Sequence, residues 1–216
     1  MSLAKPAVYL AGPMVFYKDL SVFELMKEIC AHHGLEGFAP LDNQLGLEAL
    51  APGKPTVTKI VAADFDLMEK LEGALFCLDP FRRSTEMDPG TAVEIGYMIR
   101  AGKRLAGWTA DRRSYYDKVR AFFGDEGIVR TAANSRGGTS GSDRDPDGVL
   151  IHSDGLVVNG MAQCGIELHK GKVYAHEDWR AAFEAAAMNL AAQFELAPQE
   201  PLYSKDRAAA AALELK

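Results

Sequence analysis

The sequence has little of what marks secreted, metal-binding or membrane proteins. Its three cysteines, Cys30, Cys77 and Cys164, are widely spaced and form no C-x-x-C pair, which argues against a disulfide framework or a zinc site. Its histidines show no H-x-x-x-H spacing, so no metal site is expected. No apolar run approaches the length of a membrane span, and the N-terminus carries no signal-peptide pattern. These absences predict a cytoplasmic protein with no membrane partner.

Positive charge is scarce as well, because 24 Lys and Arg residues stand against 30 Asp and Glu residues, a net charge of -6. A protein that grips nucleic-acid phosphates needs a basic surface, so a nucleic-acid polymer is not an expected partner. The sequence contains neither a Walker-type phosphate loop nor G-x-G-x-x-G. With 48% hydrophobic and 25% charged residues, it is an ordinary soluble globular mix that can still bind a small neutral ligand.

What the sequence does contain is an alternation of apolar and amphipathic segments. Residues 73–78 are almost wholly apolar, as expected for a strand buried on both faces of a parallel sheet. Strands are predicted at 7–13, 35–40, 73–78 and 103–108, and helices at 20–33, 56–71 and 89–101. The alternation predicts an α/β fold, flavodoxin-like or Rossmann-like, with three layers around a central, mainly parallel five-stranded sheet. In such sheets, ligands collect at the carboxyl ends of the strands.

The pattern weakens after Trp108. We expect a helix at 114–123, a long loop at about 131–147, a short strand or two within 149–158, and helices at 178–196 and 208–215. The predicted organisation is an α/β domain over residues 1–175 and a C-terminal helical extension over 176–216.

The densest group of chemically useful residues lies between Asp88 and Tyr97. Asp88 and Pro89 are typical of a helix N-terminus, and Glu94 falls in the second turn, where the helix dipole modestly favours an ionised carboxylate. Gly90 leaves room for a ligand or a neighbouring backbone. Asp88 is explained equally well as an ordinary N-cap. Glu94 stands between Val93 and Ile95, which do not place it on an obviously solvated face.

Other candidates have ordinary explanations of similar weight. Gln44 is able to hydrogen-bond a base edge, although turn chemistry also explains its loop. Asp64 and Asp66 lie on a predicted helix, where a lone acid is usually solvated. Tyr9 lies on a predicted buried strand, where a tyrosine more often belongs to the core than to a catalytic site.

Taken together, five separated motifs in order resemble the nucleoside 2-deoxyribosyltransferase family. The resemblance covers about residues 7–108 and 145–165. The motifs are Val8–Pro13, Pro40–Gln44, Asp64 with Leu71–Leu75, the D-x-G-T-A-x-E-x-G-Y signature at Asp88–Tyr97, and the N-x-M element at Asn159–Met161.

The resemblance implies a role for each matching residue. Glu94 would be the nucleophile, oriented by a hydrogen bond from Tyr9, and Asp88 would contact a sugar hydroxyl. Asp64 would supply a proton to the leaving base; it is preferred to Asp66 because its distance to the following strand fits better. The implied substrate-binding residues are Gln44, Gly12, Gly90, Asn159 and Met161. Since the N-x-M element comes from a neighbouring subunit in this family, the chain is expected to form a homodimer or higher homo-oligomer with shared sites.

The implied reaction exchanges one base for another on a 2-deoxyribose. A carboxylate can form a covalent glycosyl ester as the first base leaves, and a second base can then attack that ester. The expected substrates are a deoxynucleoside and a free nucleobase, with no cofactor and with hydrolysis as a side reaction. Three alternatives remain open. One is a deoxynucleoside 5′-monophosphate N-glycosidase, for which Ser84 and Thr85 near Asp88 are possible phosphate contacts. The others are a non-catalytic nucleoside-sensing domain and an α/β domain with no small-molecule site.

Overall fold

The computed structural model describes residues 5–44, 46, 50–130, 143–153 and 155–203 of the 216-residue chain. In chain order its elements, with η denoting a short 3-10 helix, are β1 (Ala7–Ala11), η1 (Pro13–Phe16), α1 (Ser21–His32), β2 (Glu36–Phe38), η2 (Pro40–Asn43), α2 (Lys54–Lys70), β3 (Gly73–Cys77), α3 (Pro89–Arg100), β4 (Arg104–Thr109), α4 (Tyr115–Phe123), η4 (Asp125–Gly127), β5 (Val129–Arg130), β6 (Asp143–Arg144), α5 (Gly160–Leu168), β7 (Val173–Ala175) and α6 (Trp179–Gln193).

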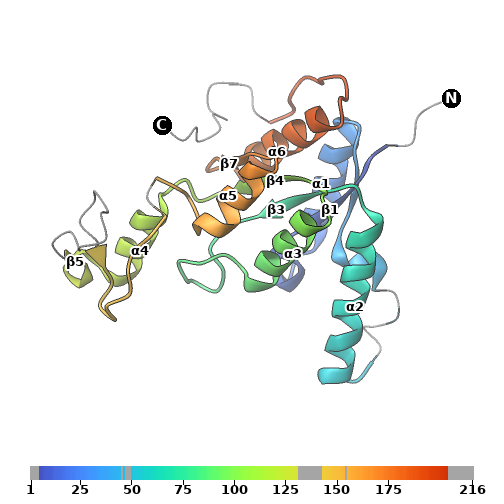
Figure 1. Cartoon of the computed structure of the whole chain (residues 1–216). Coiled ribbons are helices and arrows are strands. Elements are labelled where there is room, and N and C mark those ends of the chain that lie inside the picture. The colour runs from blue at the N-terminus through green and yellow to red at the C-terminus, as the bar shows by residue number, and fades with distance from the viewer. Residues whose placement is uncertain (1–4, 45, 47–49, 131–142, 154, 204–216) are drawn as a thin grey trace.

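A five-stranded sheet forms the centre of the molecule, in the order β2-β1-β3-β4-β7. Every neighbouring pair in it is parallel, and β1 lies between β2 and β3, with Tyr9 opposite Phe38 on one side and Ala74 on the other. This strand order is the doubly wound, flavodoxin-like one, in which the chain reverses its winding direction between β1 and β3. The predicted α/β fold with a parallel five-stranded sheet is confirmed (Figure 1).

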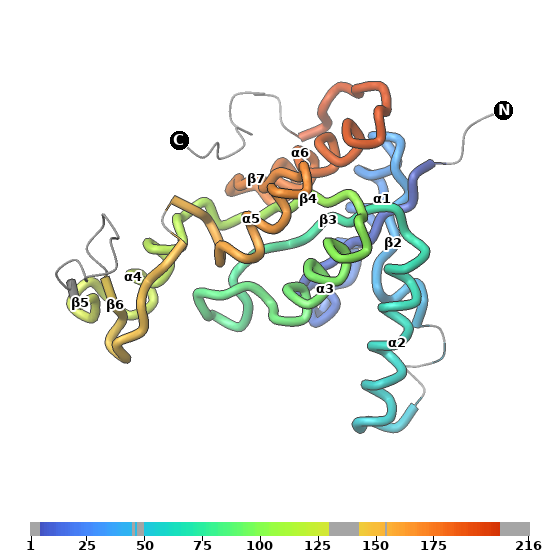
Figure 2. Tube along the Cα trace, viewed as in Figure 1, coloured from blue at the N-terminus to red at the C-terminus, as the bar shows by residue number. Residues whose placement is uncertain are grey.

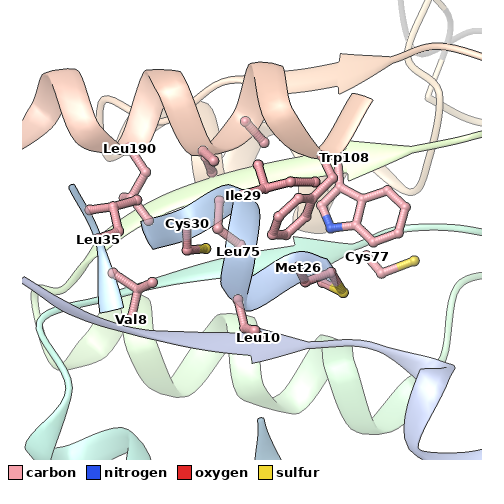
Figure 3. Close-up of a cluster of buried hydrophobic side chains, with 14 of the residues drawn as sticks. Val8, Leu10, Met26, Ile29, Cys30, Leu35, Leu75, Cys77, Trp108 and Leu190 are labelled. Carbon is pink, nitrogen blue, oxygen red and sulfur yellow. The ribbon is translucent and has the colours of Figure 1, made fainter. Parts of the chain in front are cut away.

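Helices cover both faces of this sheet because its strands carry apolar side chains on both sides. Along β1, Val8 and Leu10 point to one face while Tyr9 and Ala11 point to the other. The first face packs against α1 and α6, and part of this cluster is shown in Figure 3. The second face packs against α2, α3 and α5. Figure 2 shows α2 extending beyond the sheet at one end of the molecule, with α4, β5 and β6 at the other.

The C-terminal half of the chain differs most from the sequence-based expectations. Neither α5 nor the fifth strand, β7, was predicted. Residues 143–144 of the expected long loop pair with β5 as a short antiparallel strand. Within the described part of residues 149–158 there is no strand, only an isolated bridge from Leu150 to Arg144, because the segment passes over α4 instead of entering a sheet. The helix predicted at 208–215 lies outside the described residues.

Helix α6 belongs to the central three-layer structure, although it follows the predicted domain boundary at residue 175. Its buried face includes Phe183, Ala186 and Leu190, which pack with α1 and the sheet in the first core cluster. The N-terminus of α6 is capped by Asp178, whose side chain accepts a hydrogen bond from the backbone N–H of Arg180. The division into a domain and an extension stays a prediction, but α6 itself packs as the third layer.

No helix within the described ranges has both the length and the apolar character needed to cross a membrane.

Candidate active site

A cavity of about 580 Å³ opens at the carboxyl ends of β1 and β2, beside the point between β1 and β3 where the sheet changes winding direction. Its walls come from η1, η2, α2 and α3, four elements that are far apart in the sequence. It is lined by six of the residues singled out from the sequence: Gly12, Gln44, Asp64, Asp88, Gly90 and Glu94. The volume lies in the range of pockets that enclose a small organic ligand.

Glu94 projects from the second turn of α3 into this cavity. Its Oε1 accepts a hydrogen bond of 2.8 Å from the hydroxyl of Tyr9, which is fully buried on β1. The hydrogen bond expected between these residues is therefore present. Burial raises the pKa of Glu94 to about 7; the hydrogen bond from Tyr9 opposes this shift, while the negative charges of Asp64 and Asp88 add to it. Glu94 is thus an oriented carboxylate that titrates near neutral pH.

Asp64 reaches the same cavity from α2. Its Oδ1 accepts a hydrogen bond of 2.7 Å from the Gln44 side-chain amide, which joins the η2 loop to α2. Burial raises the pKa of Asp64, and the hydrogen bond from Gln44 opposes this rise. Asp66, the alternative candidate, is exposed and does not line the cavity. The geometry therefore favours Asp64 as the acid that faces a ligand.

Asp88 forms the N-cap of α3, as its position before Pro89 predicted. Its Oδ2 accepts hydrogen bonds from the Thr91 backbone N–H at 2.9 Å and from the Thr91 hydroxyl at 3.2 Å. Oδ1 makes no hydrogen bond within the described part of the chain, and Asp88 lines the cavity, so this oxygen is available to a ligand. The cap and a binding role are therefore compatible in one side chain.

Two glycines allow the backbone to approach closely here. Gly12, just after β1, has φ 151°, and a Cβ on it would lie 2.5 Å from the Cβ of Cys77. A Cβ on Gly90 would lie 2.9 Å from Oδ2 of Asp88, the oxygen that caps α3. Both glycines were singled out from the sequence as substrate-binding. Their positions show a physical need for glycine at the cavity.

The apolar wall of the cavity was not identified as part of a site from the sequence. It consists mainly of one face of α2 with contributions from η1 and α3, and includes Phe16, Val57, Ile60, Val61, Phe65 and Val93. The signal was present as a helical spacing of apolar residues in α2, but that spacing is also typical of an ordinary core face. In the structure, the N-terminal part of this face borders the cavity, Phe65 and Met68 contact both the cavity and the core, and Leu67 and Leu71 belong to the core.

Asn159 and Met161 do not line the cavity of the single chain. Asn159 caps α5, accepting a hydrogen bond of 2.9 Å from the Met161 backbone N–H. The Met161 side chain is 86% exposed. Their contribution to a neighbouring subunit's site stays a prediction. Among the described residues, no group of His, Cys, Asp and Glu side chains is arranged to hold a metal ion.

Comparison with known proteins gives consistent matches. The family model described as nucleoside 2-deoxyribosyltransferase matches residues 8–161. An uncharacterized protein of Schizosaccharomyces pombe (strain 972) is 45% identical over 193 residues, which cover 87% of this chain and 90% of the relative. The solved structure of a 2-desoxiribosyltransferase from Leishmania mexicana has a TM-score of 0.56 at 24% identity, covering 84% of this chain and 97% of that one.

A second solved structure, a conserved protein from Enterococcus faecalis V583, has a TM-score of 0.50 at 20% identity over 81% of this chain and 94% of that chain. At these identities, the two solved structures establish the fold.

Proposed function

The chain belongs to the nucleoside 2-deoxyribosyltransferase family, and from this premise we propose that it transfers a 2-deoxyribosyl group between nucleobases through a covalent ester on Glu94. The observation that carries the proposal is the placement of Glu94. Its carboxylate lines a ligand-sized cavity, Tyr9 holds one of its oxygens, and a second acid with a raised pKa reaches the same cavity from another helix. These are the groups that a two-step glycosyl transfer requires.

In the first half-reaction, the free carboxylate oxygen of Glu94 attacks the anomeric carbon of the deoxyribose. The bond between that carbon and the base nitrogen breaks, and its electron pair goes to the base. The base takes a proton from Asp64, whose burial raises its pKa and so favours the protonated acid more than in an exposed aspartate. The hydrogen bond from Tyr9 fixes the attack geometry of Glu94, which reduces the entropy lost on reaching the transition state.

In the second half-reaction, an incoming base attacks the same carbon from the side that the first base left. The ester bond breaks, Glu94 recovers its carboxylate, and the ionised Asp64 accepts the proton that the incoming base loses. Two inversions give net retention and a ping-pong cycle. Water in place of the base gives hydrolysis by the same steps. We assign the free Oδ1 of Asp88 to a sugar hydroxyl and Gln44 to the base edge.

Charge around the cavity favours a nucleoside over a nucleoside 5′-monophosphate. None of the described residues that line the cavity is a lysine or an arginine, whereas Asp64, Asp88 and Glu94 are all acidic. A phosphate with one to two negative charges would be repelled there. Ser84 and Thr85, which supported the N-glycosidase alternative, do not line this cavity. The single chain therefore supports the transferase better.

A base-exchange assay tests the proposal directly. Thymidine or deoxyinosine serves as the donor and adenine as the acceptor, and products are analysed with and without the acceptor. Formation of deoxyadenosine supports transfer. Release of free deoxyribose at the same rate in both reactions would show a hydrolase, and tight binding without either product would show a sensing domain.

The covalent step has its own test. Rapid quenching of the enzyme with donor alone, followed by mass spectrometry of peptides, should reveal a deoxyribosyl adduct on Glu94. Direct displacement without an ester would leave the Glu94 peptide unmodified while exchange still proceeds.

A further inference from the structure

A second pocket lies at the carboxyl ends of β3 and β4, apart from the cavity that contains Glu94. It has a volume of about 600 Å³, and we call it the β3–β4 pocket, defined by Tyr17, Arg83, Ser84, Arg113, Lys118 and Phe122. The 79–88 loop connects the two sites, since Arg83 and Ser84 line the β3–β4 pocket and Asp88 at its end lines the catalytic cavity. No step proposed for base exchange uses this pocket.

A buried ammonium group forms part of its wall. Lys118 is only 3% exposed, and its Nζ donates a hydrogen bond of 2.7 Å to the carbonyl oxygen of Val157. An ammonium has three N–H donors, so two remain without a partner within the described part of the chain. No carboxylate of the described residues lies within ion-pair distance of it. Burial lowers the pKa of Lys118, and the negative charges of Asp111, Asp79 and Glu86 only oppose this shift, so an anion bound beside Nζ would stabilise the charged form.

Arg83, an exposed side chain, brings a second positive charge to the pocket through a strained turn. Arg82 and Arg83 are successive non-glycine residues in the left-handed region, with φ of 53° and 59°. The turn is held by hydrogen bonds from the Phe81 N–H to Glu86 O at 2.8 Å and from the Ser84 N–H to Phe81 O at 3.0 Å. Arg83 makes no ion pair within the described residues. Strain of this kind concentrates at ligand sites.

The acidic residues nearby are already engaged by protein donors. Asp79 accepts hydrogen bonds from the Thr109 hydroxyl and the Ala110 N–H, both at 2.7 Å. Asp111 pairs with the guanidinium of Arg113, and Glu86 accepts a hydrogen bond from the Tyr115 hydroxyl. The pocket lining carries three cations and two carboxylates, a net charge of +1 in a protein of net charge -6. Arg83 and Lys118 therefore remain for a ligand.

We propose that the β3–β4 pocket binds a phosphate monoester of a planar ring compound, such as a nucleoside monophosphate, independently of the catalytic cavity. Guanidinium and ammonium groups with a serine hydroxyl match the several acceptor oxygens of a phosphate. The exposed rings of Tyr17 and Phe122, which are 48% and 56% exposed, provide flat surfaces for the ring. The binding does not depend on the proposed base exchange.

Calorimetric titration of the full-length protein with adenosine 5′-monophosphate, inorganic phosphate and adenosine tests this site without turnover. The monophosphate should bind at least about tenfold more tightly than either fragment, since it alone uses both halves of the pocket. Absence of binding by the monophosphate, or equal binding by adenosine, would overturn the proposal.

Arg82 offers a matched control for Arg83. Both have the same backbone conformation, but the Arg82 guanidinium lies over the Phe81 ring, 4.8 Å from its centroid, and does not line the pocket. Arg83→Ala, and also Arg83→Gly, which relieves the backbone strain, should weaken monophosphate binding about tenfold, while Arg82→Ala should leave it within about twofold. Equal losses in the Arg82 and Arg83 variants would contradict a specific site.

Competition decides whether the monophosphate occupies this pocket or the catalytic cavity. In Glu94→Gln, saturating 2′-deoxyadenosine should leave the affinity for the monophosphate unchanged. Displacement by the deoxynucleoside would place the monophosphate in the catalytic cavity and overturn the inference.

Discussion

The Glu94 carboxylate, our proposed nucleophile, contributes unfavourably to folding stability near neutral pH. Burial and two neighbouring carboxylates raise its pKa to about 7 from the ordinary value of 4.5. As pH rises above about 4.5, the unfolded chain ionises Glu94 while the folded protein still holds the proton. Folding stability therefore falls between about pH 4.5 and pH 7 on account of this group.

Replacing Glu94 with Gln should separate its proposed role in base exchange from its effect on folding stability. We expect base exchange to fall by at least about 10³-fold, because an amide cannot form the ester. As the pH rises from 5 to 8, the unfolding free energy of the variant should increase by about 1–2 kcal/mol relative to that of the wild type. This value is reduced to allow for the partial solvent exposure of the group. Urea unfolding at both pH values measures the gain. If Glu94→Gln were less stable than the wild type at pH 8, the folded protein would stabilise the ionised Glu94 carboxylate, contrary to this prediction.

The pH dependence of the reaction should follow the same group. Attack requires the ionised form of Glu94 and departure of the base requires the protonated form of Asp64, so kcat/KM should rise with pH toward about 7 and fall again where Asp64 loses its proton. Steady-state rates in constant ionic strength buffers from pH 5 to pH 9 test this. A rate that is already flat below pH 6 would assign the nucleophile to a different group.

Tyr9 should act by positioning and tuning Glu94. Its hydrogen bond lowers the pKa of Glu94, so Tyr9→Phe should move the rising limb of the kcat/KM profile to higher pH. The loss of a hydrogen bond to a charged group should reduce kcat about 10- to 100-fold. Tyr174→Phe on β7 is the matched control, because Tyr174 lies outside the cavity and should leave the profile in place. If the kcat/KM profile of Tyr9→Phe were unshifted, Tyr9 would have only a structural role.

At the scale of elements, α3 carries both Glu94, the proposed nucleophile, and Asp88, the N-cap that we assign to a sugar hydroxyl. The first turn positions Asp88 through two hydrogen bonds from Thr91, and the second turn presents Glu94. The spacing between the two carboxylates is therefore set by the rise and twist of one helix.

Two glycines in α3 allow this arrangement to be tested. Gly90→Ala should displace Asp88, because the new Cβ would lie 2.9 Å from Oδ2, and should raise KM or lower kcat/KM about tenfold. Gly96→Ala meets no atom within 4 Å and should keep full activity while stabilising the helix by roughly 0.5–1 kcal/mol. Steady-state kinetics and thermal unfolding of both variants provide the comparison. Equal activity in the two would show that the position of Asp88 is unimportant.

At the scale of the whole molecule, the single chain leaves one side of the proposed site unassigned. Asn159 and Met161 lie away from the cavity, at the exposed N-terminus of α5. If a partner subunit supplies Asn159, the site is complete only in an oligomer, and each chain contributes residues to two sites.

Subunit mixing tests shared sites. Glu94→Gln and Asn159→Ala should each be inactive alone, but co-refolded as a dimer at equal amounts they should recover about a quarter of wild-type activity, since half the dimers are mixed and each mixed dimer has one intact site. Asn159→Asp, which keeps an acceptor for the Met161 N–H, controls for loss of the α5 cap. No recovery on mixing would show that Asn159 acts within its own chain.

The sequence by itself determined the features that depend on a few neighbouring residues. Apolar runs and helical spacing defined β1, β3, β4 and their flanking helices, and Asp88-Pro89 defined the start of α3. The expectation that Asp88 and Glu94 occupy one helix followed from the same local pattern. The resemblance to a known family added Tyr9 and Gln44, whose separate positions in the chain carry no mark of a shared site.

Only the tertiary structure decided which distant groups meet. Placing β1 beside β3 brings Tyr9 to Glu94, 85 residues away, and the packing of η2 on α2 brings Gln44 to Asp64. Strand β7 is too short to have a readable pattern, and the α2 face that lines the cavity has the spacing of an ordinary core face. The burial of Lys118 likewise depends on the segment that passes over α4. Local hydrogen bonding and side-chain periodicity are encoded over a few residues. These contacts instead depend on which strands lie side by side in the sheet and on how the connecting segments pack around it.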